Sequence, residues 1–163
     1  MAAGLVSVWT LLTPAESQDR SFDLMDVIGE WEGEGMFLMP VTDVEIDIEG
    51  KGKFVYLPEL NVIRTEMSGS KFMLSYTDSG YLRYYPESDS VSWEIWDSWG
   101  KHSLYWGEIK GDQLVAQREH PKRYYKVTVE FPHPDTLDFR LTSREKESGD
   151  TEEKARFILW RTK

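Results

Sequence analysis

Apolar and polar residues alternate one by one along several stretches of the chain. The clearest runs cover residues 44–49, 125–131 and 137–142. A period of two is typical of a β-strand that has one buried and one solvated face. Turn-forming residues separate the runs, at Pro58-Glu59, Ser68-Gly69, Asp78-Ser79-Gly80, 86–89, Trp99-Gly100, Gly111-Asp112, 132–135 and Ser148-Gly149-Asp150. The spacing predicts an all-β fold of about ten short strands, in an antiparallel sandwich or barrel.

One short helix is expected before the strands. Ser21 can cap a helical segment over residues 22–28, in which Leu24, Met25 and Ile28 share a face, and Gly29 can end it. The helical period does not continue beyond Gly29, so the remaining chain is expected to be strands and turns.

The first twenty residues differ from the rest. Residues 2–13 are apolar but too few to cross a bilayer, which takes about 20 residues. Small residues follow at Ala15 and Ser17, where a signal peptidase would read them, although the basic segment of a signal peptide is missing. Residues 1–20 are therefore predicted to be either a signal peptide, which implies export or a periplasmic location, or an N-terminal helix of a cytoplasmic protein. Residues 21–163 form the predicted domain.

The first strand has an unusual composition. Trp31, Gly33, Gly35 and Phe37 fall on one face, and glutamates fall on the other. Glycines inside a strand mark a bend or a close approach of two backbones, and a closing barrel needs both. A bulged edge strand is the alternative.

The run Gly29-Glu30-Trp31-Glu32-Gly33-Glu34-Gly35 resembles the first strand of the calycin superfamily. It is most similar to a bacterial lipocalin-like family of unassigned function. Residues 93–100 and 105–112 also resemble the central aromatic strands of that family. The resemblance covers residues 22–163 and implies an antiparallel lipocalin-like β-barrel. In calycins a basic residue of the last strand crosses the first-strand tryptophan, and alternation places Arg161 where it would close the barrel over Trp31.

Nitrobindin, a heme-binding barrel, opens with a similar strand, so the resemblance raises heme as a cofactor. Nitrobindin continues with Tyr-Pro and ligates iron through a histidine near its C-terminus. In this chain residues 36–40 do not match and no histidine follows His133. No cofactor is therefore expected.

Composition removes several other functions. The net charge of −10 repels phosphate backbones, so nucleic acid is not an expected partner. The chain has no cysteine, which excludes thiolate chemistry, and its three histidines have no metal-ligand spacing. The acidic runs read as solvated strand faces, and no nucleophile motif is present. No catalytic or metal-binding residue is predicted.

Aromatic residues crowd the stretch from Tyr76 to Trp106, with more ring surface than barrel closure requires. Alternation places Trp93 and Trp106 on the inward face. It also allows Arg83 and Arg118 to point inward, where a guanidinium needs either an internal glutamate or a ligand carboxylate as partner. The predicted ligand-binding residues are Phe37, Tyr76, Arg83, Tyr85, Trp93, Trp106, Arg118 and Tyr125.

The predicted function is non-catalytic binding of a small apolar or amphipathic molecule, including acidic ones, inside the barrel. Whether the rings leave a cavity or fill the interior is open at this point. One alternative is an enzyme acting on a small carboxylated substrate, as phenolic acid decarboxylases do among calycins, with Arg83, Tyr84, Tyr85 and Glu94 as candidate residues. Another is an interaction module, in which Trp96 and Trp99 form an exposed patch for a partner or a homodimer.

Overall fold

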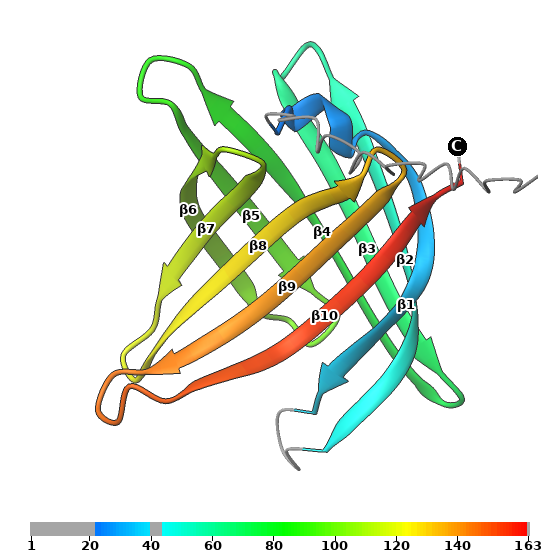
Figure 1. Cartoon of the computed structure of the whole chain (residues 1–163), viewed down its shortest axis with the longest axis vertical. Coiled ribbons are helices and arrows are strands. Elements are labelled where there is room, and N and C mark those ends of the chain that lie inside the picture. The colour runs from blue at the N-terminus through cyan, green and yellow to red at the C-terminus, as the bar shows by residue number, and fades with distance from the viewer. Residues whose placement is uncertain (1–21, 40–43, 163) are drawn as a thin grey trace, which may run out of the picture.

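Ten antiparallel strands close into a barrel in the computed structural model, which describes residues 22–39 and 44–162 (Figure 1). Each strand pairs with the next along the chain, and β1 pairs with β10 to complete the circle. The strands are β1 Gly29–Leu38, β2 Glu45–Leu57, β3 Val62–Lys71, β4 Leu74–Tyr85, β5 Ser90–Asp97, β6 His102–Lys110, β7 Gln113–Glu119, β8 Arg123–His133, β9 Thr136–Glu145 and β10 Thr151–Arg161. The all-β barrel expected from the alternating pattern is confirmed.

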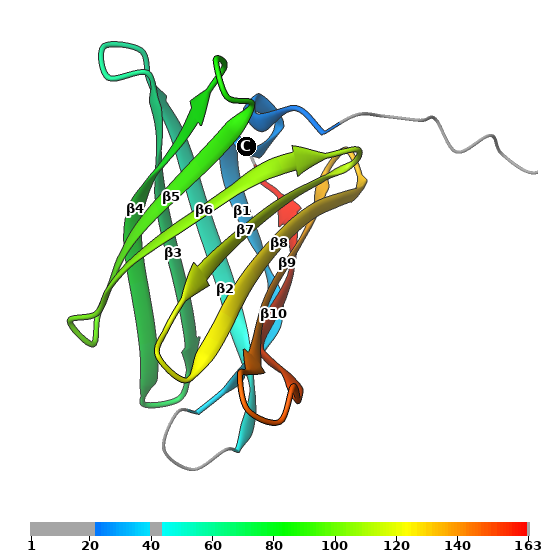
Figure 2. The same cartoon turned by 90° about the vertical axis from the view of Figure 1, so that its left-hand side faces the viewer.

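The two ends of the barrel differ. The turns that follow β2, β4, β6 and β8 lie at one end, together with the short helix η1 and the end of β10, and we call this end the floor (Figure 2). The turns that follow β3, β5, β7 and β9 lie at the opposite end, which we call the mouth. Every strand therefore runs from floor to mouth or back.

The helix is shorter than predicted. It is a single 3-10 turn, Leu24–Val27, and Asp23 caps it by accepting a hydrogen bond from the amide of Met25 at 2.9 Å. Val27 is the buried residue of the turn, whereas Met25 is largely exposed. Four residues are too few for the predicted helical face to form. Ser21 and the predicted signal peptide or N-terminal helix over residues 1–20 lie outside the described residues.

Trp31 and Arg161 meet at the floor. The indole of Trp31 is 1% exposed and donates a hydrogen bond to the carbonyl of Val27 at 2.8 Å. The guanidinium of Arg161 lies 4.2 Å from the ring centroid of Trp31 and donates to the carbonyls of Ile28 and Asp26 at 2.6 and 2.8 Å. This is the arrangement that the calycin resemblance implies, and it also ties η1 to the last strand.

The glycines of β1 allow β10 to approach. A Cβ atom on Gly33 would lie 2.0 Å from the carbonyl oxygen of Ile158, and one on Gly35 would lie 2.5 Å from that of Arg156. Since β1 is paired on both sides, with β2 and with β10, the alternative of a bulged edge strand is wrong.

Two of the predicted turns are instead continuous strand. Ser68-Gly69 lies within β3 and Asp78-Ser79-Gly80 within β4, and the turn between these strands is formed by Phe72 and Met73. Gly80 serves close backbone approach, because a Cβ there would lie 2.0 Å from the carbonyl oxygen of Glu94. Glycine as a turn signal and glycine as a packing requirement cannot be told apart by residue type alone.

Inward side chains fill the floor half of the barrel. Trp93 lies in this filled region, and its indole donates to the Thr65 hydroxyl at 3.2 Å and meets Phe139 edge-on at 6.1 Å. The void left among these side chains is about 10 Å³, too small for a ligand. Fully buried residues of this region include Trp31, Leu82, Val91, Trp93, Leu114, Leu137 and Leu159.

Of the described helices, none has the length and apolar character needed to cross a membrane.

Candidate ligand-binding cavity

The mouth half of the barrel encloses a cavity of about 470 Å³. Side chains therefore fill the floor half of the interior and leave a cavity in the half toward the mouth. The aromatic part of the lining consists of Phe37, Tyr76, Trp99, Tyr105, Tyr125, Phe139 and Phe157. Its ionisable part consists of Asp78, Asp97, Lys101, Arg118, Arg123 and Lys154.

Arg118 forms the basic wall. It stands on β7 directly opposite Tyr125 of β8, and its guanidinium lies 4.7 Å from the Tyr125 ring centroid and 5.6 Å from that of Tyr105. The two rings stabilise the cation through their π faces. Its Nε is nevertheless buried and has no hydrogen-bond partner within the described chain.

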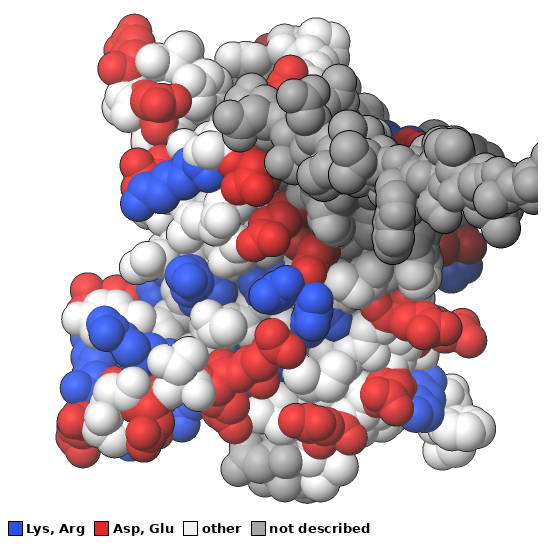
Figure 3. All heavy atoms as spheres, in the orientation of Figure 1, with Lys and Arg blue, Asp and Glu red and all other residues white. Residues whose placement is uncertain are grey.

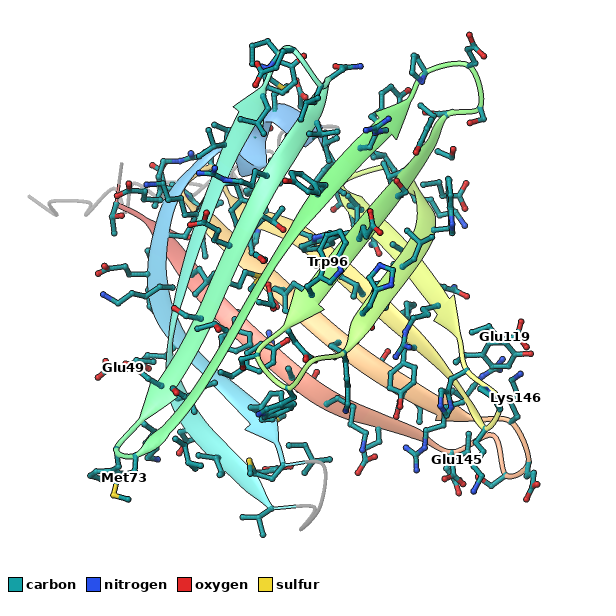
Figure 4. All side chains as sticks on the ribbon, turned by 180° about the vertical axis from the view of Figure 1, so that it is seen from behind. Glu49, Met73, Trp96, Glu119, Glu145 and Lys146 are labelled. Carbon is teal, nitrogen blue, oxygen red and sulfur yellow. The ribbon has the colours of Figure 1, made fainter. Side chains whose placement is uncertain are left out.

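Arg123 is a contrasting basic residue. It donates to the Ser143 hydroxyl at 3.0 Å, to Glu145 at 2.6 Å and to Glu152 at 3.3 Å. These partners hold it at the rim, where the turns after β7 and β9 lie side by side and Glu119, Glu145 and Lys146 gather (Figure 4). Arg118 differs from Arg123 in that its unpaired Nε is buried.

Asp78 forms the acidic wall. It stands on β4 opposite Asp97 of β5, and its Oδ1 is buried without a hydrogen-bond partner among the described residues. Burial raises the pKa of the Asp78 carboxyl from 3.8 to about 7, and the negative charge of Asp97 adds to the effect. The hydroxyl of Tyr76 and the backbone of Met67 lower this pKa but do not outweigh burial. Asp78 therefore exchanges its proton near neutral pH.

Asp97 has a different role. Its Oδ1 accepts hydrogen bonds from the amides of Trp99 at 3.0 Å and Lys101 at 2.9 Å. These bonds build the turn between β5 and β6, together with Gly100 at a φ of 76°. Oδ1 of Asp97 is therefore already paired within the protein.

Two phenols of the lining accompany these walls, Tyr76 on β4 beside Asp78 and Tyr105 on β6. Burial raises the pKa of both Tyr76 and Tyr105, so both hydroxyls remain protonated at neutral pH. The charge of Asp78 raises the pKa of Tyr76 further, whereas Arg118 opposes the rise at Tyr105. The cavity therefore offers neutral hydroxyl groups together with an acidic and a basic residue.

Three rings meet at the mouth. Phe37 of β1 stacks on Tyr76 of β4 with 5.7 Å between the ring centroids. The ring centroid of Trp99, from the turn after β5, lies 5.6 Å from that of Phe37 and 5.1 Å from that of Tyr76. Trp99 remains 44% exposed. The cluster joins sequence segments far apart in the chain and gives the entrance an apolar side.

The structure divides the predicted ligand-binding residues into three groups. Phe37, Tyr76, Arg118 and Tyr125 line the cavity. Trp93 faces the interior but belongs to the filled half. Their predicted role in ligand binding stays a prediction.

The remaining three predicted residues are corrected. Arg83 and Tyr85 share the outer face of β4, because Leu82 and Tyr84 take the inward positions. Trp106 is 50% exposed and stacks on Tyr85 at 5.5 Å on the outside of the barrel. Its neighbour Tyr105 is the inward residue of β6. Because β6 has aromatic residues at consecutive positions, alternation by itself did not decide which of them faces inward.

Several cavity residues were missed from the sequence. Asp78 was interpreted as part of a turn, although Tyr76, Asp78, Gly80 and Leu82 have the alternation of a strand. Tyr105 was missed because its neighbour was assigned the inward position. Phe139 and Phe157 occur in strands with clear alternation, which indicates that they face inward. Whether an inward residue lines the cavity or packs in the filled half depends on its position along the barrel axis, which alternation does not give.

The candidate enzyme residues lie on both faces of the barrel wall. Arg83, Tyr85 and Glu94 lie outside the barrel, where Glu94 accepts or shares a hydrogen bond with His102 at 2.8 Å, whereas Tyr84 faces inward near the floor. The four residues therefore do not line one cavity, and the enzyme alternative stays a prediction.

Aromatic side chains also occur on the outer face of β4, β5 and β6. Trp96 stacks on His102 at 5.0 Å and meets Tyr81 edge-on at 6.1 Å, and it faces outward in Figure 4. Both Trp96 and Trp99 are exposed, Trp96 on the outer wall and Trp99 in the lining of the mouth. Their role in an interaction with a partner stays a prediction.

Charged groups on the surface are mixed. On the face that carries β8, β9 and β10, acidic and basic side chains are interspersed (Figure 3). Asp138 on this face is held by Arg140 and Arg156 at 2.6 and 2.9 Å. Among residues 22–39 and 44–162, no three histidine, aspartate or glutamate side chains gather closely enough to hold a metal ion.

Comparison with known proteins gives similarity in fold. No family model and no curated protein matches the chain. The crystal structure of Rv2717c from M. tuberculosis is similar with a TM-score of 0.64 at 16% identity, covering 86% of this chain and 95% of that one. The S-type phycobiliprotein lyase CpeS from Guillardia theta is similar with a TM-score of 0.59 at 11% identity, covering 85% and 89%. The closed ten-stranded antiparallel barrel of this chain is therefore a fold that it shares with both proteins.

Proposed function

We propose that the protein binds, without covalent chemistry, a small molecule with an apolar body and one acidic group in the cavity at the mouth. The observation that carries the proposal is the buried, unpaired Nε of Arg118 within a lining of aromatic rings. A volume of about 470 Å³ falls within the roughly 300–1,000 Å³ usual for small-molecule sites.

Arg118 supports an acidic ligand for an electrostatic reason. A guanidinium out of water needs a partner, and the Tyr105 and Tyr125 rings stabilise its charge but do not accept from Nε. A carboxylate fits the planar fork of donors that arginine presents. The rings around it supply apolar area for the rest of the ligand.

The proposal is tested by comparing acids with alcohols of the same skeleton. Binding of decanoate and 1-decanol, and of 3-phenylpropanoate and 3-phenyl-1-propanol, is measured by isothermal titration calorimetry. The acids are expected to bind more tightly than the alcohols. Arg118→Met is expected to weaken the acids by about 10-fold or more and the alcohols by less than about 3-fold, because only the charged partner is lost.

Arg83→Met is the matched control, since Arg83 lies on the outer face of β4. It is expected to leave all four affinities unchanged. Acids that bind no better than alcohols, or no binding of either at millimolar concentration, would refute the proposed function.

A further inference from the structure

Two buried polar atoms in the described chain lack a hydrogen-bond partner, and both belong to the cavity at the mouth. They are Nε of Arg118 and Oδ1 of Asp78. The great majority of buried polar side-chain atoms in proteins are paired, so unpaired ones ask for an explanation. Two in the same cavity point to a ligand that completes both.

The two atoms have opposite hydrogen-bonding character. Nε of Arg118 carries a proton and can only donate, whereas Oδ1 of an ionised Asp78 can only accept. An acidic group alone satisfies the first and is repelled by the second. A ligand that satisfies both must therefore carry a hydrogen-bond donor in addition to its acidic group.

Their positions allow one small molecule to reach both. Asp78 stands on β4 and Arg118 on β7, with β5 and β6 between them. Three steps between neighbouring strands span roughly 14 Å across the strands, and Asp78 is also displaced along β4 from Leu82, the residue in the row of Arg118. Inward side chains shorten the path across the cavity. Tyr105 on β6 interacts electrostatically with both Arg118 and Asp78, which places the two walls around a common phenol.

The nearby carboxylate does not share this feature. Asp97 faces the same cavity, but the amides of Trp99 and Lys101 already donate to it. Asp78 differs from its neighbour in that its Oδ1 is buried and unpaired, although the Tyr76 hydroxyl and the Met67 backbone also hydrogen-bond to its carboxyl group.

We infer that the ligand is bifunctional, with an acidic group bound by Arg118 and a hydroxyl or N–H group that donates to Asp78, as in a hydroxylated aromatic acid. This inference rests on the proposed function and narrows its ligand class. The aromatic lining then holds the part of the molecule between the two polar ends.

A pair of near-isosteric probes isolates the donor. They are 3-(4-hydroxyphenyl)propanoate and 3-(4-methylphenyl)propanoate, with the corresponding acetates and butanoates to vary the span between the two ends. The ratio of the two affinities is measured by calorimetry at pH 8 for the parent protein. Because the methyl group is more apolar, the informative quantity is the change of this ratio between variants.

Asp78→Val removes the acceptor and is expected to lower the hydroxyl-to-methyl affinity ratio at least about 10-fold for the probe of best length. Asp78→Asn keeps a carbonyl oxygen and is expected to retain part of the preference. Ser103→Ala, at another residue of the cavity lining, is the matched control and is expected to change the ratio by less than about 2-fold.

The outcomes separate the inference from the function on which it rests. If the acids bind with dependence on Arg118 but Asp78→Val leaves the ratio unchanged, the bifunctional ligand is refuted and the proposed function stands. If none of the acids binds at millimolar concentration, both are refuted.

Discussion

Arg161 and Arg118 both lie against inward aromatic rings of the barrel, and their surroundings differ. Arg161 at the floor stacks on Trp31 and donates to two backbone carbonyls, so its hydrogen bonds are made within the protein. Arg118 toward the mouth also lies against aromatic rings but keeps an unpaired Nε. The same residue type thus serves structure where its donors are satisfied, and remains available to a ligand where they are not.

The coupling between Arg161 and Trp31 can be measured from the free energies of unfolding of single and double variants. We expect Trp31→Ala to lower the free energy of unfolding by about 3–5 kcal/mol, because it leaves a cavity. Arg161→Ala should lower it by about 2–3 kcal/mol, because two hydrogen bonds and the ring contact are lost. The double variant should lose clearly less than the sum of both, as residues in contact do. Urea denaturation gives the three values.

Arg156 provides the comparison for this cycle. It stands on the same strand but binds Asp138 on the outer face. The effects of Arg156→Ala and Trp31→Ala should add within about 0.5 kcal/mol. If the effect of Arg161→Ala also added to that of Trp31→Ala within about 0.5 kcal/mol, the contact at the floor would contribute no coupling energy.

Asp78 makes stability depend on pH. Its pKa rises from 3.8 to about 7 on folding, so between these values the folded protein binds the proton more tightly than the unfolded chain. Stability is therefore expected to fall as pH rises through this window. Asp78→Asn removes the dependence and should raise the free energy of unfolding by about 2–4 kcal/mol at pH 8, since one pKa unit corresponds to about 1.4 kcal/mol.

At pH 4 the same substitution should have little effect, because the carboxyl is then largely protonated in the folded protein. Thermal unfolding of parent and variant at several pH values measures the difference. A stability gain that is the same at pH 4 and pH 8 would contradict the raised pKa.

At the scale of single elements, the turn between β3 and β4 is unusual. It consists of Phe72 and Met73, which are 99% and 98% exposed, and Phe72 has a φ of 53°. Figure 4 shows Met73 at the tip of this hairpin, at the mouth end of the barrel. A bulky residue in the left-handed region is strained, and with its ring in water no packing compensates.

Relieving this strain should stabilise the protein. Asparagine tolerates a positive φ better than phenylalanine does, so Phe72→Asn is expected to raise the free energy of unfolding by about 1 kcal/mol. Differential scanning calorimetry would show a higher midpoint. Met73→Asn, at the neighbouring position without a positive φ, should give no comparable gain. A midpoint that falls with Phe72→Asn would show that the ring stabilises the turn.

This hairpin also shows where sequence reasoning ends. Alternation predicted the number of strands and most of their faces, because burial of one strand face leaves a direct trace in the sequence. The turn positions depended on glycine, which here also occurs inside strands where backbones pack closely, as at Gly80. A turn of Phe72 and Met73 carries no such signal and was missed.

At the scale of the whole molecule, the barrel was predictable and its hollow half was not. The first-strand motif and the alternating runs pointed to closure, and β1 does pair with β10. The cavity depends on the summed volumes of inward side chains from all ten strands at each depth, which no local pattern contains. Four cavity residues could be selected from alternation. Asp78 fits the same alternation but stands in a stretch that resembles a turn, while Tyr105 required the register between strands.

Closure of the barrel also has a kinetic consequence. Neighbouring strands are joined by short turns, but the seam between β1 and β10 joins parts of the chain far apart, as Arg161 and Ile28 are 133 residues apart in sequence. Loop-closure entropy opposes such contacts until most of the meander has formed. The seam should therefore be absent from the folding transition state. Arg161→Ala is expected to speed unfolding with little change in the folding rate in stopped-flow urea experiments, whereas Val127→Ala within the β7–β9 meander should slow folding.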